Sequence, residues 1–506
     1  MTSIVEKNLK FWGHNCFSIA SNTTLLLIDP WFSKSGAFFG SWFQYPKNHH
    51  LQGEALDMLN KYENSFIFIT HEHQDHYDKE FLSNVQKNTT IIVPSYKDKS
   101  FKQDCESLGL KVIEIQDTDK FNLSKKFWIK PYVSHIGINH DSAILVVTEK
   151  FKFFNQNDCK IFDRLSDIDD CIDYYSVQFS GATWHPSNFI LSDKRKKEIS
   201  YKKVKNKLNN VLRGINNIKP KYFLPAAGPA IFPYLESNLS YGIDNIFTHQ
   251  DHLNEYLKDN DIHNVLYLNP GDYLDTDKMI PIQPPKNQEE IEVYKKNTIN
   301  HWQELDLNFN RDLLEKAISD RLNKISDIDI TQTPILIFNF INNFDHTDHT
   351  NENKIFIDLS NKKILNKFEY NVPYEEIISD KKYFTLMHSK ERWQNIYLSL
   401  RAKVLREPDI FNNDLNIFLF SDIENIRENF ISTRNISNER VNVKNQSGEI
   451  FEINRFCPHN GSDLCNAEIN SDNYLVCPGH GWKFDLNNNG IDKTSKTTIN
   501  SKKISP

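Results

Sequence analysis

Short apolar runs, separated by polar loops, recur through the first half of the chain. Runs of this length that are rich in Ile, Val, Leu and Phe indicate β-strands. The clearest are residues 25–28, 66–69, 90–93, 143–147 and 222–224. A few helical stretches lie between them, so we expect an α/β domain. The sequence Gln-Pro-Pro-Lys-Asn at 283–287 is typical of a linker.

The pattern changes twice after this linker. Residues 288–401 are mainly helical, with one strand pair at 335–340 and 354–358. From about residue 415 short strands return, broken by Gly, Asn and Pro. We therefore predict three parts: an α/β domain at 1–285, a mixed, mainly helical region at 286–414 and an all-β domain at 415–506.

Composition narrows the classes of protein. The 506 residues carry 60 Lys and Arg against 67 Asp and Glu, a net charge of −7, and no basic stripe argues for nucleic-acid binding. No apolar run approaches the ~20 residues that span a bilayer, and the polar residues 1–9 do not resemble a signal peptide. Seven Cys in so long a chain do not suggest a disulfide framework. We expect a cytoplasmic protein without membrane or nucleic-acid partners.

Two Cys/His loops lie near the C-terminal end. Cys457 and His459 form a CxH motif, and Cys477 and His480 form a CxxH motif. Such a pair lets one iron take two thiolates and the other two imidazoles, which is the Rieske [2Fe–2S] arrangement. A Cys2His2 zinc site is the alternative, but the short first spacing and the Gly-flanked loops are atypical of zinc fingers. We predict an all-β Rieske domain.

The rest of these loops resembles Rieske domains of oxygenases. Respiratory Rieske proteins carry an extra Cys in each loop and a Ser after the second His-Gly, whereas this chain has Ser462, Gly479 and Trp482 at these places. Fewer hydrogen bonds to the sulfurs predict a reduction potential toward about −150 mV. Such a potential suits electron delivery to oxygen chemistry.

A second metal motif follows the apolar run at 66–69. His71, His73, Asp75 and His76 form HxHxDH, which resembles the metal-binding loop of the metallo-β-lactamase fold. Trp12-Gly13-His14-Asn15-Cys16-Phe17 and Leu27-Ile28-Asp29-Pro30-Trp31 resemble the opening hairpins of that fold. The resemblance implies an αββα sandwich.

That fold places further ligands at later strand ends. His135 stands where its next His is expected, with His140 as a competitor, and Asp158 stands where its bridging Asp is expected. The final His should follow the run at 222–224, but Pro-Ala-Ala-Gly-Pro there offers no ligand. We therefore expect an incomplete second metal position, with His14 in a structural or supporting role. His185 is a weaker candidate for the site.

Read as a whole, the chain resembles the CMP-N-acetylneuraminate hydroxylase family, which also joins a Rieske domain to a metallo-β-lactamase-like domain. The matching segments run along nearly all of the chain: 29–31, 37–42, 71–76, 135–141, 155–159, 225–228, 373–377, 406–410 and 482–485. In the animal enzyme the Rieske domain comes first, whereas here it comes last. The family also lacks the final His, so the gap at Ala227-Gly228 is shared.

The resemblance implies an iron-dependent monooxygenase. The cluster would pass electrons to non-haem iron, or zinc in its place, held by His71, His73, His135 and Asp158, with Asp75 and His76 as further ligands. O2 would be the oxidant, and a separate NAD(P)H-driven reductase with a ferredoxin or cytochrome b5-like carrier would supply electrons, because no Gly-rich nicotinamide fingerprint is present. The substrate would be an N-acyl sugar or nucleotide sugar such as CMP-N-acetylneuraminate, and a homo-oligomer is a candidate assembly. The alternatives are a zinc hydrolase with a redox-sensing Rieske domain and a pure electron carrier.

Overall fold

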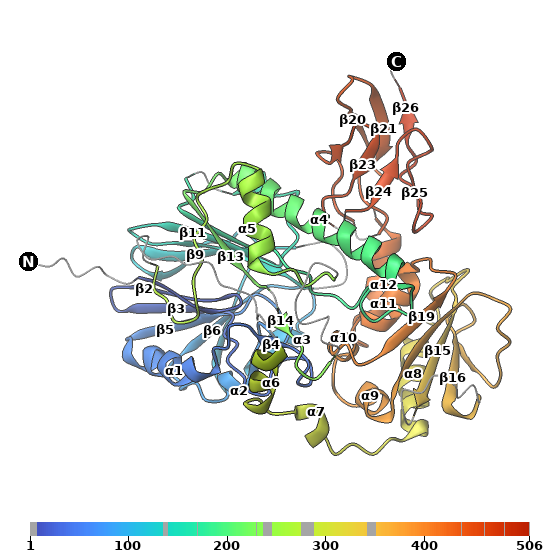
Figure 1. Cartoon of the computed structure of the whole chain (residues 1–506), viewed down its shortest axis with the longest axis horizontal. Helices are drawn as coiled ribbons and strands as arrows, with labels where there is room; N and C mark the ends of the chain where they lie inside the picture. The colour runs from blue at the N-terminus through green and yellow to red at the C-terminus, as the bar shows by residue number, and fades with distance from the viewer. Residues whose placement is uncertain are drawn as a thin grey trace, which may run out of the picture. The chain divides into compact units, whose positions relative to one another are not determined.

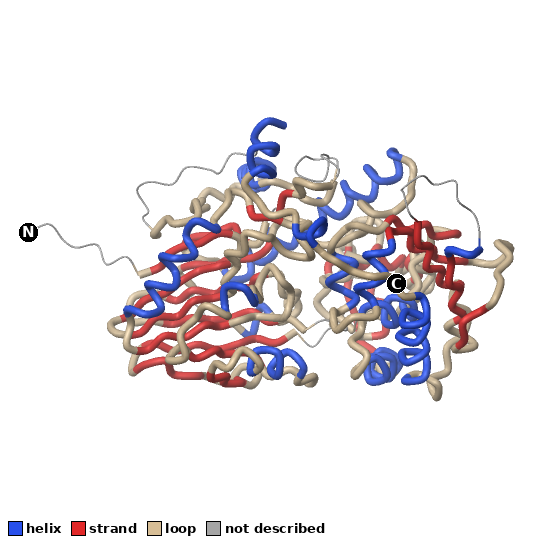
Figure 2. The backbone as a smooth tube through the Cα atoms, turned by 90° about the horizontal axis from the view of Figure 1, so that it is seen from below, coloured by secondary structure: helices blue, strands red, loops and turns tan. Residues whose placement is uncertain are grey.

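The computed structural model describes residues 8–134, 140–168, 171–228, 230–235, 245–274, 288–341, 351–436, 438–459, 461–479 and 481–504. The chain divides into two compact units (Figures 1 and 2). The first unit comprises residues 1–135, 140–182 and 197–303, and the second comprises 136–139, 183–196 and 304–506. No helix in the described ranges combines the length and the apolar character that a membrane span requires.

Two six-stranded sheets build the first unit. The first sheet has the order β1-β2-β3-β5-β6-β7, and its strands are β1 (Leu9–Gly13), β2 (Cys16–Ser21), β3 (Thr24–Ile28), β5 (Asn64–Phe68), β6 (Thr90–Pro94) and β7 (Lys111–Ile115). The second has the order β13-β12-β11-β10-β9-β8, and its strands are β8 (Phe121–Ser124), β9 (Phe127–Val133), β10 (Ser142–Val147), β11 (Lys152–Asn157), β12 (Tyr174–Gln178) and β13 (Tyr222–Ala226). A short pair joins β4 (Phe43–Gln44) to β14 (Ala230–Ile231). The five predicted strand runs all fall on strands of these two sheets.

An apolar layer lies between the sheets, and helices cover their outer faces. Phe17 of β2 and Phe153 of β11 meet in the middle layer, with ring centroids 5.1 Å apart. The first sheet packs against α1 (Gln52–Lys61), α2 (Lys79–Leu82) and α3 (Ser100–Glu106). The second packs against α4 (Asp193–Ile218) and α5 (Gln250–Asp259). This is the predicted αββα sandwich (Figure 1).

The long helix α4 shows why the outer layer forms. Val204, Leu208, Val211 and Ile215 are buried, and their spacing of three or four residues places them on one face of the helix. The opposite positions are rich in Lys and Asn, which remain in water. Gly214 belongs to the same face, because a Cβ there would stand 2.2 Å from the hydroxyl of Tyr175. The unit also includes α6 (Gln288–Lys296) and most of α7 (His301–Glu304).

The middle of the chain folds as a five-stranded sheet with helices. The sheet order is β17-β16-β15-β18-β19, and the strands are β15 (Ile335–Ile341), β16 (Lys354–Asp358), β17 (Lys363–Leu365), β18 (Tyr374–Asp380) and β19 (Lys403–Glu407). The helices are α8 (Arg311–Lys324), α9 (Lys381–Met387), α10 (Trp393–Leu398), α11 (Asn413–Phe420) and α12 (Ile426–Arg434). The predicted strand pair corresponds to β15 and β16, and the region is mixed, as expected, with more strand than the pattern indicated.

The C-terminal segment from residue 440 onward is all-β. The predicted all-β domain began at 415, but residues 413–420 and 426–434 form α11 and α12, the first of which is capped by the side chain of Asn412. One sheet contains β20 (Arg440–Lys444), β21 (Ile450–Asn454) and β26 (Lys502–Lys503). The other contains β22 (Glu468–Ile469), β23 (Tyr474–Val476), β24 (Lys483–Asp485) and β25 (Ile491–Asp492). The small core of this segment includes Phe451, Leu475 and Phe484, and the two cysteines Cys457 and Cys477 are buried beside them.

Candidate metal centres

The loop after β5 gathers the side chains of the HxHxDH motif. His71 and His76 are almost fully buried, with side-chain exposures of 1% and 0%. Nε2 of His71 lies 2.9 Å from Nδ1 of His73, so these two ring nitrogens face one point. The backbone N–H of His76 donates to the carbonyl of His73 and turns the loop back. The rings of His71 and His76 therefore lie only 4.3 Å apart.

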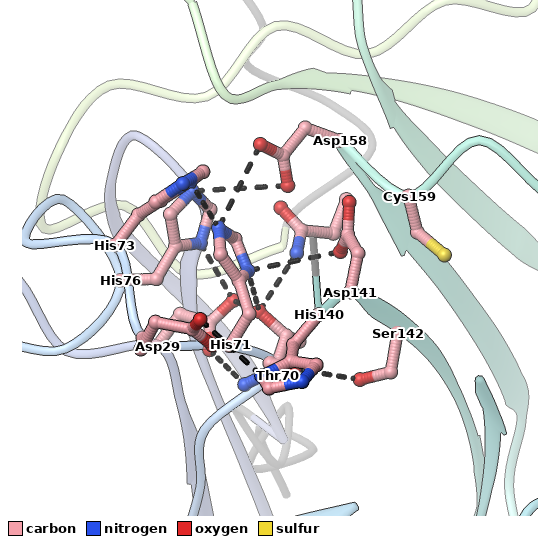
Figure 3. A network of polar contacts seen from close by, with 12 residues as sticks. Asp29, Thr70, His71, His73, His76, His140, Asp141, Ser142, Asp158 and Cys159 are labelled. Carbon is pink, nitrogen blue, oxygen red and sulfur yellow. Dashed lines mark hydrogen bonds and ion pairs between the residues drawn. The ribbon is translucent and has the colours of Figure 1, made fainter. Parts of the chain in front are cut away.

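The second sheet contributes carboxylates to the same place. Asp158 directly follows β11, and Asn157 before it has a φ of 60°. Oδ2 of Asp158 lies 3.8 Å from Nε2 of His71, and its Oδ1 lies 4.0 Å from Nε2 of His76. Oδ1 of Asp141, just before β10, lies 3.7 Å from Nδ1 of His71. Figure 3 shows these carboxylates facing the histidines, so both sheets build the site.

A buried carboxylate supports the motif from behind. Asp29 follows β3, which is the parallel neighbour of β5, and it is fully buried with a φ of 43°. It accepts hydrogen bonds of 2.7 Å from the backbone N–H and the hydroxyl of Thr70 and from the side-chain amide of Asn15. Its Oδ2 also lies 2.9 Å from Nδ1 of His76. This contact places the ring proton on Nδ1 and leaves Nε2 directed at the ligand cluster.

Burial and neighbouring charges shift the pKa values of these groups in opposite directions. Burial lowers the pKa of His71 to about 4, against the opposing effect of Asp158. Burial also disfavours the charged form of His76, but the carboxylates of Asp75 and Asp158 outweigh it and raise the pKa of His76 to about 10. The pKa of Asp75 is held below its usual value, because the neighbouring imidazoles outweigh the effect of burial. The ionised form of Asp75 is thus favoured, whereas burial raises the pKa of Asp141 well above its usual value.

Two groups of three ligand-type side chains result. In each group, one ligand atom per residue lies within 4.8 Å of the others: His71, His73 and Asp158 form the first, and His14, Asp75 and His76 form the second. Nε2 of His76 and Oδ1 of Asp158 are buried and have no hydrogen-bond partner among the residues that the structure describes. Imidazole and carboxylate are ligands that suit iron and zinc. The residues present therefore fit a metal ion.

The remaining predicted ligands have different outcomes. His135 lies outside the described residues. His140 stacks on Tyr96, with centroids 4.7 Å apart, and its Nδ1 lies 3.3 Å from Oε1 of Glu72; it belongs to neither ligand group. His185 groups with the second unit, where its ring packs edge-on against Phe189.

Two loops of matching geometry carry the C-terminal motif. The N–H of Cys457 donates to the carbonyl of Ser462 at 2.9 Å, and the N–H of Cys477 donates to the carbonyl of Trp482 at 2.8 Å. In each loop the glycine four residues after the cysteine donates back to the cysteine carbonyl, and both glycines, at 461 and 481, have φ near the left-handed region, 77° and 70°. Each loop thus presents a thiol at the same place in the same turn.

The cysteines and the first histidine of this motif are enclosed. Cys457 and Cys477 are 0% and 1% exposed, and His459 is 8% exposed. The ring of His459 stacks on Trp482 with centroids 4.2 Å apart, and Phe411 packs edge-on against it. His480 lies outside the described residues. A Cβ at Gly479 would stand 2.3 Å from Oγ of Ser462 and 3.9 Å from Sγ of Cys477. Glycine at 479 therefore lets the two loops approach closely, and their buried thiols and imidazole are donors that fit a Rieske-type iron–sulfur cluster.

Known protein families match the segments that contain the two candidate sites. Residues 417–501 match the Rieske [2Fe-2S] domain, and residues 8–131 match a β-lactamase superfamily domain. A Mycolicibacterium smegmatis protein described as a Rieske 2Fe-2S iron-sulfur protein is 28% identical over 230 residues, which are 44% of this chain and 43% of that protein. The chain thus spans less than half the length of this relative.

Two further proteins are similar to a larger part of this chain. Cytidine monophosphate-N-acetylneuraminic acid hydroxylase of Mus musculus is 22% identical over 453 residues, 81% of this chain and 72% of that protein. The solved metallo hydrolase Igni18 of Ignicoccus hospitalis covers 53% of this chain and 96% of its own, with 12% identity and a TM-score of 0.34. The predicted domain types are confirmed: the chain combines an N-terminal domain of the β-lactamase superfamily with a C-terminal Rieske [2Fe-2S] domain, and it is similar over most of its length to a CMP-N-acetylneuraminic acid hydroxylase.

Proposed function

We propose that this protein is an iron-dependent monooxygenase in which the Rieske cluster supplies electrons to a metal site in the β-lactamase-type domain. One observation carries the proposal: the same chain holds a cluster domain and a separate group of imidazoles and carboxylates that fits iron. A Rieske cluster transfers single electrons and does not itself bind a substrate. The group around His71 is where we place the chemistry.

The proposed roles follow from the geometry of the side chains. His71 and His73 would hold the metal through Nε2 and Nδ1, the two nitrogens that face each other. Asp158 would add a carboxylate, since one of its oxygens faces His71 and the other faces His76. His135 is the fourth ligand that we propose from the sequence. Iron bound here would supply the redox chemistry that activates O2.

The C-terminal residues would bind the cluster and shape its surroundings. Cys457 and Cys477 would supply thiolates to one iron, and His459 and His480 would supply imidazoles to the other. Trp482 and Phe411 cover His459 and keep water away from its ring. Electrons would come from a separate reductase through a ferredoxin or cytochrome b5-like carrier.

The proposed substrate class is a sugar that carries an N-acyl group, free or linked to a nucleotide. Support comes from the long similarity to the murine hydroxylase, whose name specifies CMP-linked N-acetylneuraminic acid. Hydroxylation would place one oxygen atom of O2 into a C–H bond and release the other as water, with two electrons and two protons supplied from outside.

The decisive experiment uses the protein purified without oxygen and supplied with Fe(II). We expect O2 uptake that needs both an electron donor and a sugar substrate, with a product heavier by one oxygen atom that carries label from ¹⁸O2. Turnover of a hydrolysable substrate without oxygen or reductant would instead identify a metal-dependent hydrolase. NADH, a reductase–ferredoxin pair and a panel of CMP-, UDP- and free N-acyl sugars are the components of the assay.

A further inference from the structure

His14, which the sequence predicted only in a structural or supporting role, lies beside the ligand-type side chains of the first unit. It occupies the turn between β1 and β2, and its side chain is only 6% exposed. Nε2 of His14 lies 3.1 Å from Oδ2 of Asp75. Its ring lies 5.3 Å from the ring of His76 and packs edge-on against Trp31 at 5.0 Å. An imidazole from the first hairpin therefore reaches the HxHxDH loop.

The backbone holds this imidazole in place. His14 has a φ of 51°, in the left-handed region that only a few per cent of residues other than glycine adopt. Gly13 before it has a φ of 116°, and a Cβ there would stand 2.5 Å from Oε1 of Gln44. The carbonyl of His14 accepts a 2.9 Å hydrogen bond from the N–H of Ala227. Strained backbone that its surroundings fix in this way is typical of functional positions.

Ala227 belongs to the segment that lacks the last histidine of the β-lactamase-type motif. In this chain the segment following β13 offers no ligand, and its backbone supports the His14 turn instead. A ring nitrogen of His14 instead lies within 4.8 Å of the ligand atoms of Asp75 and His76. The loss of one imidazole and the arrival of another therefore occur at the same side of the site.

We propose that His14 is a ligand of a second metal ion, which it binds together with Asp75 and His76. The first domain then holds two ions, one at each ligand group, with the carboxylate of Asp158 between them. The ion is a divalent first-row transition metal, since two imidazoles and a carboxylate are its preferred donors. This deepens the proposed oxygenase function, and the number of ions can be measured whether or not that function holds.

The test counts metal ions in full-length variants. His14→Gly and His14→Asn both remove the imidazole and both tolerate a φ near 50°, so the turn can keep its shape. His263→Ala is the matched control, because His263 is exposed in the first unit. Each protein is loaded anaerobically with excess Fe(II) and desalted. Total metal is then measured, and the iron of the cluster, equal to its labile sulfide, is subtracted.

We expect two ions beyond the cluster in the parent and in His263→Ala, and one ion in both His14 variants. Free imidazole added during loading should restore the second ion to His14→Gly, because the open space admits the missing ring. Far-UV circular dichroism and thermal melting check the fold of each variant. Two ions retained in a folded His14 variant, or only one in the parent, would overturn the proposal. If oxygenase activity is absent while the counts hold, only the proposed function fails.

Discussion

Oδ2 of Asp29 lies 2.9 Å from Nδ1 of His76, and both side chains are fully buried. The same carboxylate accepts the backbone N–H of Thr70, so one side chain fixes both the start of the metal loop and the orientation of its last ring. Supporting partners of this kind determine which ring nitrogen faces the metal. The site therefore depends on a residue that is not expected to touch the ion.

Replacing Asp29 should weaken metal binding without removing a ligand. In Asp29→Asn the charge that holds the proton on Nδ1 of His76 is lost, and we expect metal affinity to fall by about 10- to 100-fold. Competition with a fluorescent chelator measures the change. Asp57→Asn, an exposed position on α1, is the control and should match the parent. An unchanged affinity in folded Asp29→Asn would contradict the supporting role.

Removing a ligand of the first group should disrupt the metal site of the first domain and leave the Rieske cluster intact. We expect His73→Ala to abolish product formation while the EPR spectrum of the reduced cluster stays intact, because the cluster ligands come from the second unit. Activity and EPR are measured on the same preparation. Loss of the cluster signal in His73→Ala would show that the two sites are not independent.

The reverse variant tests the electron path. Cys457→Ser removes a buried cluster thiol, and we expect it to stop multiple turnover while the ions of the first domain remain bound. Metal analysis and O2 uptake with the donor system check both points. A hydrolase would behave differently, since its turnover would survive this substitution and would need no oxygen.

The hydroxyl of Ser462 should tune the cluster potential. Its Oγ is buried without a hydrogen-bond partner among the described residues, and both it and Sγ of Cys477 lie within 4 Å of where a Cβ on Gly479 would stand. Hydrogen bonds to cluster sulfurs raise the potential, so we expect Ser462→Ala to lower it. Spectroscopic redox titration measures the shift, with the exposed Ser471→Ala as control. A potential equal to that of the parent would place the hydroxyl away from the sulfurs.

A buried ion pair in the middle region offers a stability test. Arg406 and Glu375 lie 3.0 Å apart, with side-chain exposures of 9% and 11%. Arg406→Ala leaves a buried carboxylate unpaired, and we expect the free energy of unfolding to fall by about 3–5 kcal/mol. In the double variant Arg406→Met/Glu375→Leu most of this loss should be recovered. Denaturant unfolding of the three proteins decides between these outcomes.

The same ion pair explains why part of the fold was harder to predict. The strand β18 contains Glu375 and Glu376, which suggest an exposed segment, yet both are buried. Glu375 is neutralised by Arg406 of the adjacent strand β19, and Glu376 by Lys354 of β16, which lies on the far side of β15, at 3.0 Å. Partners that lie far apart in the sequence leave no local pattern, whereas the alternating apolar runs of the first unit predicted their strands correctly.

In the candidate sites too, residues that are close in the sequence were predictable and residues brought together by packing were not. The Cys/His loops and the HxHxDH loop bring their residues together within a few positions, so spacing alone predicted them. Asp29 and His14 reach the site only because separate strands pack together. The position of Asp29 in the site could have been inferred from the sequence, since polar residues that follow two parallel strands, β3 and β5, meet at one edge of a sheet. For His14 the sequence motif predicted only a structural or supporting role, because its approach to Asp75 depends on a left-handed turn held by Ala227.

Several described residues around the first-domain site adopt left-handed backbone, among them His14, Asp29, Asn157 and Ala227. Hydrogen bonds of Asp29 and Asn157 to Thr70, and of Ala227 to His14, hold the ligand-type side chains of this site near one another. Imidazole and carboxylate groups bind zinc at least as strongly as Fe(II). Which ion occupies such a site therefore depends mainly on which ion is available. If the proposed function holds, we expect protein made in zinc-rich medium to be folded and coloured by its cluster but inactive as an oxygenase, so the supply of iron would decide how much of it is active.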